Sequence, residues 1–413
     1  MKKTINQILD NKKYILITLI VVSFLVRLAA VFFARDFQID NEWKVLLDNL
    51  VNNNSYSYYI FDNKLIPSAL LPPLYPFFLY FIKTLTSLEG LNLINLIIFI
   101  QIILSTYSVY LFLQINLNFF NIKLSLLNSI IFSTIPLNIY ACGQISSICL
   151  QVFFLLFFLK VLFELSENQN NKNIIFFSLA SSMMILIRGE FILFFILTIF
   201  FIYLYKKIKI INLLKIIIIT ILIISPYVAR NYIQFNQFFI VKSLGYNLWK
   251  GNNQLSTVDG YENFQSSEFA QLNDKVLKIK QNKYYEISRD NIFLKEAISN
   301  ITKEPIYYFK LYIKKIFSYF FIDINSKYPN YYNFLHLFPI IVISIIAAPG
   351  FFVMSKMKSF KSRYIIFLLL VNLMIFSIFF ILPRYKLAIL PMQIILAAYF
   401  VSYILKKFKI NIF

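Results

Sequence analysis

Residues 14–33 read YILITLIVVSFLVRLAAVFF, and this stretch decides the class of fold. A helix of about twenty residues rises about 30 Å, which matches the thickness of the hydrocarbon core of a bilayer. A cleaved signal peptide has a shorter apolar core and a small-residue cleavage site. The stretch therefore predicts an uncleaved first membrane span.

The composition of the whole chain agrees with a membrane protein. Of 413 residues, 59% are hydrophobic and 14% charged, against about 25% charged in soluble domains. The mean hydropathy is +0.69. Disordered chains are poor in apolar residues and are excluded. The net charge of +21 does not indicate a nucleic-acid partner, because the basic residues lie between long apolar runs instead of on one soluble face.

Scanning for apolar runs of bilayer length predicts an all-α polytopic bundle of about ten spans. The predicted spans are 14–33, 91–113, 124–141, 148–165, 174–187, 191–205, 212–229, 334–353, 364–382 and 387–405. The basic residues cluster at alternate ends, as at Lys12, Lys206 and Lys407, while the 142–147 turn has none. Because cytoplasmic segments carry excess Lys and Arg, both termini are expected in the cytoplasm.

Two long segments then fall on the outer side. We expect an N-terminal module over 1–229, which includes a first outer loop at 34–90 with the catalytic residues. An outer segment at 230–333 and C-terminal helices at 334–413 follow. Within the outer segment, residues 290–319 alternate apolar and basic positions near helical spacing, which predicts interfacial helices broken at Pro305.

The cysteines and the histidine do not indicate a metal centre. Cys142 and Cys149 are the only cysteines and His336 is the only histidine, whereas a structural zinc site needs four such ligands. We interpret the cysteines as buried small hydrophobes, with a disulfide as the alternative, and His336 as an interfacial residue.

An acidic cluster follows the first span directly. Asp36, Asp40 and Glu42 lie within seven residues at a membrane exit. They are interpreted as a general base or a cation site, with a solvated helix cap as the alternative. Arg27, inside the first span, is expected either to extend to the headgroups or to pair with one of these carboxylates.

Arginines occur on the side that normally lacks basic residues. Arg188 lies in LIRGE, Arg230 in PYVARNY, and Arg384 is followed by Tyr385 and Lys386. Guanidinium groups suit bidentate contact with phosphate oxygens. Each residue taken singly is equally well explained by contact with headgroups, but together they favour a phosphate site.

Two further motifs complete the set. LPPLYP at 71–76 opens an apolar stretch too short for a span, and its prolines suit a rigid helix start. GYNLWKGNN at 245–253 has the Asn, Trp and Gly composition of a sugar-binding turn, although composition alone is a weak indication.

In this order, the Asp-containing loop, PPLYP, LIRGE, PYVARNYIQF, YNLWKGNN and LPRYKLAILP resemble the integral-membrane glycosyltransferases of the GT-C superfamily. The likeness covers nearly the whole chain. It is greatest to the group that contains the dolichyl-phosphate-mannose–protein mannosyltransferases and the lipid A aminoarabinose transferase. The resemblance implies a sugar donor on a polyprenyl-phosphate carrier and an envelope acceptor, which is a lipid, a glycan or a protein. It also implies a bacterial inner membrane with the active site on its outer face.

The resemblance also implies roles for single residues. Asp40 matches the acidic residue of the first outer loop and is expected to be the general base, with Glu42 as its neighbour. The remaining matched positions are expected to contact the lipid phosphate or the sugar; they are Arg230, Asn231, Asn252, Arg384 and Tyr385. Many relatives carry an acidic residue where this chain reads GQISS at 143–147. No cofactor is therefore assigned, and a divalent metal is left open as an alternative.

A sugar phosphate already has a good leaving group, so one base and one direct attack at the anomeric carbon predict inversion. Two other classes fit the span count. A flippase or transporter of lipid-linked saccharides places its polar residues near mid-membrane at broken helices. A polysaccharide polymerase also uses outer-side arginines, but has no evident need for an acidic cluster after the first span.

Overall fold

The computed structural model describes residues 2–323, 326 and 333–409 and is almost entirely helical. All ten predicted spans are helices. They are α1 (Lys2–Phe33), α4 (Gly90–Asn116), α5 (Ile122–Thr134) with α6 (Pro136–Gly143), α7 (Ile148–Glu167), α8 (Asn171–Ile187), α9 (Phe191–Leu204), α10 (Ile210–Phe235), α15 (Phe334–Ser355), α16 (Phe360–Ile378) and α17 (Lys386–Lys407).

Not all of these helices have the length of a membrane span. Seven of those in the described residues are long and apolar enough to cross a bilayer, or eight if α5 and α6 form one broken span. The predicted third span is bent by 52° between Thr134 and Pro136. Proline disfavours helical geometry in the preceding residue, and Ile135 is accordingly extended at ψ 118°. Helices α8 and α9 have only 17 and 14 residues.

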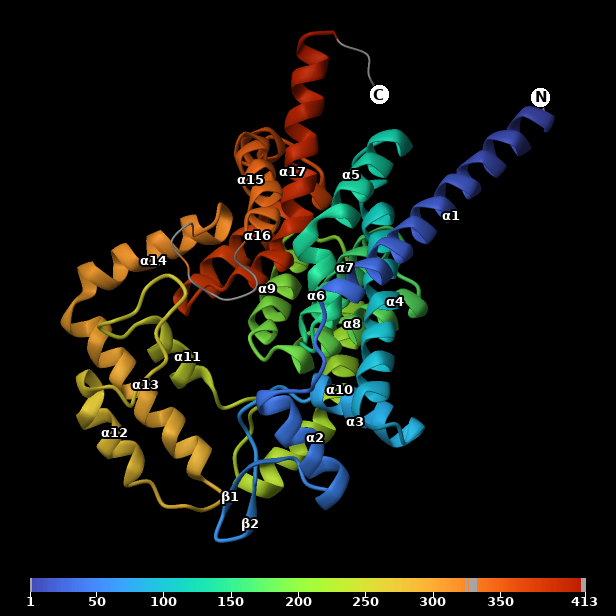
Figure 1. Ribbon diagram of the computed structural model, residues 1–413. Helices are drawn as coiled ribbons and strands as arrows, with labels where there is room; N and C mark the ends of the chain where they lie inside the picture. The colour runs from blue at the N-terminus through green and yellow to red at the C-terminus, as the bar shows by residue number, and fades with distance from the viewer. Residues whose placement is uncertain (1, 324–325, 327–332, 410–413) are drawn as a thin grey trace.

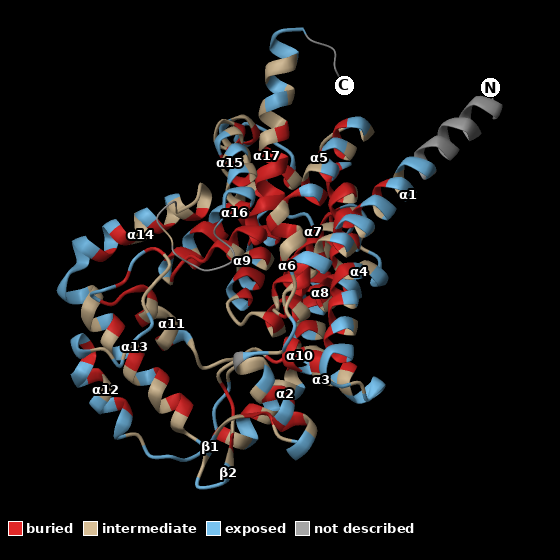
Figure 2. Cartoon of the chain, viewed as in Figure 1, coloured by how far each residue is buried: buried red, intermediate tan, exposed pale blue. Residues whose placement is uncertain are grey.

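The bundle buries its centre and exposes apolar residues on its periphery. Figure 2 shows buried residues concentrated in α7, α8 and α17. Gly350 of α15 lets the backbone of α17 approach at the Leu396 carbonyl, where a Cβ would collide with it. Peripheral residues such as Leu25, Ile218 and Leu222 are more than half exposed. Exposed apolar surface of this extent suits contact with lipid, and the chain is a multi-pass membrane protein.

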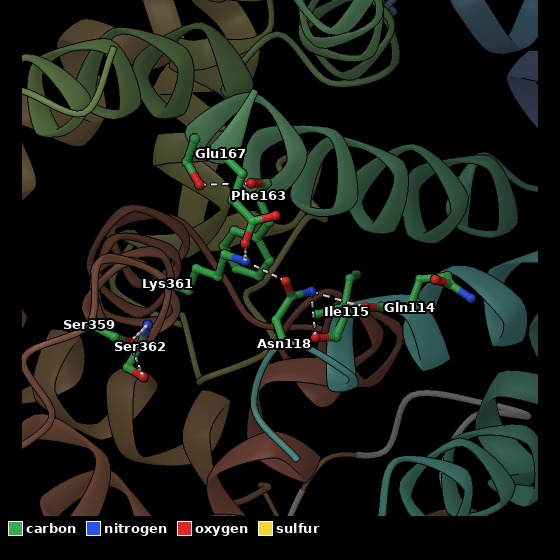
Figure 3. Close-up of polar contacts among 9 residues, drawn as sticks. Gln114, Ile115, Asn118, Phe163, Glu167, Ser359, Lys361 and Ser362 are labelled. Atoms are coloured by element: carbon green, nitrogen blue, oxygen red, sulfur yellow. Dashed lines mark hydrogen bonds and ion pairs between the residues drawn. The ribbon is translucent and has the colours of Figure 1, made fainter. Parts of the chain in front are cut away.

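Figure 1 places the N- and C-terminal ends at the same end of the bundle, away from the β-hairpin. At that end Lys361 of α16 pairs with Glu167 of α7 and donates a hydrogen bond to Asn118, beyond α4 (Figure 3). Its ammonium also lies 5.8 Å from the centre of the Phe163 ring. Lys361 therefore joins three parts of the bundle.

The segment between α1 and α4, predicted as the first outer loop, folds into a small unit. It contains α2 (Asn41–Asn53), an antiparallel hairpin of β1 (Ser57–Phe61) and β2 (Lys64–Pro67), and α3 (Leu74–Thr86). The hairpin turn places Asp62 and Asn63 at φ 48° and 59°, the left-handed region that Asp and Asn tolerate. The PPLYP motif starts α3, because Pro73 occupies its N-cap position. The predicted rigid helix start is confirmed.

The segment predicted as outer at 230–333 forms a helical subdomain, seen beside the bundle in Figure 1. It contains α11 (Leu244–Gly251), the 3₁₀ turn η1 (Ser267–Phe269), α12 (Ala270–Leu277), α13 (Tyr285–Lys303) and α14 (Pro305–Phe320). A core of its own includes Trp249, Phe269 and Phe293. The predicted break at Pro305 is confirmed. Residues 324–325 and 327–332, at the end of the predicted 230–333 segment, lie outside the described residues.

Candidate active site

A cleft of about 1520 Å³ lies where the bundle meets the unit between α1 and α4 and the helical subdomain. The unit between α1 and α4 contributes Asp36, Asp40 and Glu42, and the helical subdomain contributes residues of α11 and α13. From the bundle come the α6–α7 and α8–α9 turns, one face of α10, and the turn η2 (Pro383–Tyr385), which precedes α17. Five of the nine predicted site residues line this cleft, namely Asp40, Glu42, Arg188, Arg384 and Tyr385.

The acidic cluster is one of two charged groups that line the cleft. Asp36 holds the loop against the α6–α7 turn, because its carboxylate accepts the Ile145 N–H at 2.7 Å and its own N–H donates to the Gly143 carbonyl at 3.0 Å. Burial raises the pKa of Asp36, and the nearby Asp40 carboxylate raises it further. Asp40 itself is exposed to the cleft.

Asp40 occupies the N-cap position of α2, yet its side chain accepts no capping hydrogen bond. Its Oδ2 accepts instead from the Gln38 amide at 3.1 Å. The alternative interpretation of Asp40 as a helix cap is therefore not supported. Its carboxylate is available to a substrate, as a general base requires.

The residues of the acidic cluster do not assemble an evident metal site. In the part of the chain that the structure describes, no three His, Cys, Asp or Glu side chains come together to hold an ion. One carboxylate oxygen of Asp36 is already bound to the Ile145 amide. We therefore derive no step through a metal.

Arg188 and Arg384 form the second charged group of the cleft, which we call the arginine pair. Arg188 follows α8 as its C-cap residue, and its Nε donates to Gln151 at 3.0 Å. Its guanidinium carbon lies 4.7 Å from the centre of the Tyr385 ring. The guanidinium carbon of Arg384 lies 6.0 Å from the same ring. Both arginines are half-buried, so Tyr385 brings two cations together in a poorly hydrated place.

Arg230 and Asn231 are not among the residues that line the cleft. Arg230 donates to the carbonyls of Ser68 at 2.7 Å and Tyr56 at 3.0 Å, and so holds the hairpin against α10. The amide of Asn231 donates to the carbonyls of Phe239 and Ile240. Their polar groups thus support backbone that borders the cleft, and any contact with substrate stays a prediction.

The 245–253 motif has two parts: Tyr246, Asn247 and Lys250 line the cleft, whereas its glycines, Trp249 and Asn252 form a structural junction. Gly245 packs against the backbone of Asp290 in α13, and Gly251 packs against the backbone of Phe379. A side chain at either position would collide with a carbonyl group. Trp249 is fully buried, and the Asn252 amide donates to the carbonyls of Leu248 and Ile378 at 2.8 Å. Asn252 is also outside the cleft lining.

Two buried lysines stabilise helix ends behind the cleft. Lys386 donates to the carbonyls of Tyr319, at 2.7 Å, and Phe320, which end α14. Lys315 of α14 donates in turn to the carbonyl of Gly251 at 2.7 Å, at the end of α11. Cations suit helix C-termini because the last carbonyls lack partners there. Lys386 was predicted to contact phosphate, but it is fully buried and its ammonium serves a helix end beside the arginine pair.

Arg27 corrects another expectation. It is fully buried and neither reaches the headgroups nor pairs with a carboxylate. Its Nε donates to the Ser105 hydroxyl at 2.7 Å, and its Nη1 donates to the carbonyls of Ser23 and Ser133. The guanidinium joins α1 to α4 and α5 within the bundle. The two cysteines are free and buried, as predicted.

Sequence reasoning missed several residues of the cleft, namely Tyr58, Tyr59, Glu262 and Arg289, whereas Tyr246 and Lys250 belong to the 245–253 motif. Lys250 and Glu262 form an ion pair with each other. Arg289 lies just before the predicted helical stretch 290–319, and one more basic residue in a basic chain carries no distinguishing signal. Its contacts with aromatic residues of other segments form only when the chain folds.

Neither a family model nor a curated protein matches this sequence. Solved structures do. The oligosaccharyltransferase AglB from Archaeoglobus fulgidus, in complex with an inhibitory peptide and a dolichol-phosphate, matches over 96% of this chain and 51% of that one, at 12% identity and a TM-score of 0.57. The apo form matches at 11% identity and a TM-score of 0.55, with the same coverage. The chain thus spans about half the length of that enzyme.

ArnT from Cupriavidus metallidurans, bound to undecaprenyl phosphate, matches at 10% identity over 94% of this chain and 77% of that one. Its TM-score of 0.43 is too low to carry an argument. The likeness to AglB shows that this polytopic chain has a fold of the GT-C type, as the resemblance implies.

Proposed function

We propose that this protein is a membrane glycosyltransferase that moves a sugar from a polyprenyl-phosphate carrier to a hydroxyl group of an envelope acceptor. The observation that carries the proposal is one cleft lined by two unlike charged groups, the carboxylates of Asp40 and Glu42 and the arginine pair. The GT-C-type fold supports it, as does the dolichol-phosphate in the complex of the archaeal oligosaccharyltransferase.

The arginine pair suits the phosphate of the donor. Guanidinium groups offer planar, paired N–H donors to phosphate oxygens, and the low local polarity strengthens these contacts. As the bond from the phosphate to the sugar breaks, charge accumulates on the departing phosphate, and prepositioned cations stabilise it. Contact with Tyr385 holds the Arg188 guanidinium in place before the substrate binds.

An apolar wall extends the cleft and suits the polyprenyl chain. It includes Ile192 and Leu193 of α9 and Ile221, Ile224 and Val228 of α10. Ile192, Leu193 and Ile221 are each more than 40% exposed. An isoprenoid chain that covers these side chains gains about 25 cal/mol for each Å² of apolar surface removed from water or headgroups.

The acidic cluster suits the acceptor. In the proposed step the Asp40 carboxylate takes the proton of the acceptor hydroxyl, and the hydroxyl oxygen attacks the anomeric carbon. The bond between that carbon and the phosphate oxygen breaks, and the lipid phosphate leaves with its electron pair. Attack from the side opposite the phosphate inverts the configuration. The arginine pair and the carboxylates then act on opposite sides of the reacting carbon.

The orientation belongs to the same proposal. Both chain ends lie at the end of the bundle that carries Lys361, Lys406 and Lys407. By the positive-inside rule this end faces the cytoplasm, and the cleft then faces the outside of a bacterial inner membrane.

The donor half of the proposal is tested with radiolabelled undecaprenyl phosphate and the matched alcohol, undecaprenol. Purified protein in detergent is expected to retain the phosphate at least about tenfold more tightly than the alcohol, since charge-assisted contacts are worth about 1.5–3 kcal/mol each. Arg384→Gln should remove this preference. Arg363→Gln is the control, because Arg363 is not among the residues that line the cleft and contacts Tyr205 instead. Equal retention of both lipids by the unaltered protein would contradict the proposal.

A further inference from the structure

The cleft contains a cation that the donor does not need. Arg289 of α13 lines it from the helical subdomain, whereas the arginine pair belongs to the bundle, on α8 and η2. Figure 1 shows α13 apart from α8 and α9. A lipid-phosphate donor carries one phosphate, and the arginine pair already accounts for it.

Arg289 is rigidly held. Its Nη1 donates to the Tyr59 hydroxyl at 2.9 Å. Its guanidinium carbon lies 5.1 Å from the centre of the Tyr246 ring and 5.4 Å from those of Phe264 and Phe293. Aromatic faces attract a guanidinium without neutralising its charge, so these contacts fix its position and leave its capacity for an anion.

Two carboxylates of the same helix, Glu286 and Asp290, are engaged in hydrogen bonds with other residues. Glu286 accepts from the Ser68 hydroxyl and the Ala69 N–H, and Asp290 accepts from the Tyr246 N–H at 2.9 Å. Burial raises the pKa of both carboxyl groups, while these hydrogen bonds and the charge of Arg289 act against that rise. None of the ion pairs within the described ranges includes Arg289.

Arg289 lies on the acceptor side of the cleft. Burial raises the pKa of the Tyr58 phenol, Glu42 raises it further, and Arg289 lowers it. One phenol thus feels both the acidic cluster and Arg289. The exposed faces of Tyr58, Tyr59 and Tyr246 border the same region, where aromatic rings suit the apolar faces of sugar rings.

We infer that Arg289 binds an anionic group of the acceptor, and that the acceptor is an acidic glycan or glycolipid whose carboxylate or phosphate rests on Arg289 while its hydroxyl faces Asp40. The inference rests on the proposed function and narrows its substrate class. A neutral acceptor would leave this half-buried cation without an anionic ligand in the complex and would forgo the binding energy of a charge-assisted contact.

The test compares three probes that differ in one group, namely octyl β-glucoside, octyl β-glucuronide and octyl β-glucoside 6-phosphate. Their affinities are measured by thermophoresis of the purified full chain in a maltoside detergent. The two anionic probes are expected to bind at least about tenfold more tightly than the neutral one, as for one charge-assisted contact. The variants are Arg289→Gln, Arg289→Lys and the control Arg363→Gln.

Arg289→Gln should reduce the preference for the anionic probes to less than about twofold. Arg289→Lys should keep part of this preference, because an ammonium retains the charge but lacks the paired N–H donors of the guanidinium. Arg363→Gln should keep all of it. The inference is overturned if the unaltered protein shows no preference, if Arg289→Gln retains it, or if an acidic peptide binds more tightly than both anionic glycosides.

Binding of undecaprenyl phosphate, measured on the same preparations, separates this inference from the proposed function. Arg289→Gln should leave it unchanged, which also shows that the variant is folded. If the protein binds the lipid phosphate normally but shows no preference for the anionic probes, only the assignment of an acidic acceptor is contradicted. If the unaltered protein does not bind undecaprenyl phosphate, the proposed function itself is contradicted.

Discussion

The guanidinium carbon of Arg188 lies 4.7 Å from the centre of the Tyr385 ring, which joins the end of α8 to the turn before α17. Arg384 borders the same ring. A long, flexible side chain loses rotamer freedom when it is fixed on an aromatic face. In this protein that entropy is lost on folding, so a bound phosphate does not have to order the arginine again.

Replacement of Tyr385 tests this relationship. Tyr385→Leu should weaken the binding of undecaprenyl phosphate about threefold to tenfold, because an aromatic contact with a cation is worth about 0.5–2 kcal/mol. Tyr385→Phe keeps the ring and should bind nearly normally. Retention of the lipid phosphate by purified protein measures both. Equal losses in the two variants would show that the hydroxyl, not the ring face, matters.

Asp40→Asn should abolish sugar transfer, by at least about 100-fold, because an amide cannot accept the proton of the acceptor. The variant should fold normally, because among the described residues the Asp40 side chain accepts a hydrogen bond only from the exposed Gln38. Asp48→Asn is the matched control, as Asp48 is exposed on the same helix and outside the cleft lining. Transfer and thermal stability are measured on the same samples. Near-normal transfer by Asp40→Asn would remove its assignment as the base.

The burial of Lys315 leads us to expect that the stability of the protein depends on pH. Burial lowers the pKa of its ammonium to about 7, from an ordinary value of about 10.4. Between these values the unfolded chain binds more protons than the folded one, so the free energy of unfolding should rise with pH, by at most about 1.4 kcal/mol per unit. Thermal unfolding from pH 7 to 10 should show the rise, and Lys315→Met should flatten it. The same slope in both proteins would contradict the assignment.

The junction between α11 and α13 depends on a missing side chain. A Cβ at Gly245 would collide with the Asp290 carbonyl, so Gly245→Ala should lower the free energy of unfolding by about 1–3 kcal/mol. At Gly189 a Cβ would meet Val241 at 3.4 Å, an ordinary contact. Gly189→Ala should therefore change the melting temperature much less. A stable Gly245→Ala protein would show that α11 and α13 separate without cost.

The sequence predicted the bundle well because apolar runs of bilayer length depend little on tertiary context. Pro136 and Pro305 also carry a local signal, although only Pro305 was recognised as a break. The bend at Ile135 was missed because the run from 124 to 141 is continuously apolar. Hydropathy measures transfer into lipid and is insensitive to the direction of a helix.

The candidate site was predicted only in part, for a different reason. Arg188, Arg230 and Lys386 look alike in sequence, as basic residues on the side that normally lacks them. In the structure Arg188 lines the cleft, Arg230 supports the hairpin, and Lys386 stabilises the end of α14. Which carbonyl or cavity a cation meets is decided by contacts between segments far apart in the chain. Arg289 was overlooked for the same reason.

The central claim is that the cleft makes a glycosidic bond and releases a lipid phosphate. The most direct measurement is mass spectrometry of undecaprenyl phosphate and of new glycosylated products after purified protein is mixed with an envelope lipid extract of the source cells. The unaltered protein should release the lipid phosphate together with a new product, and Asp40→Asn should form neither. Absence of both from the unaltered protein, although it binds undecaprenyl phosphate, would contradict a transferase and favour a transporter.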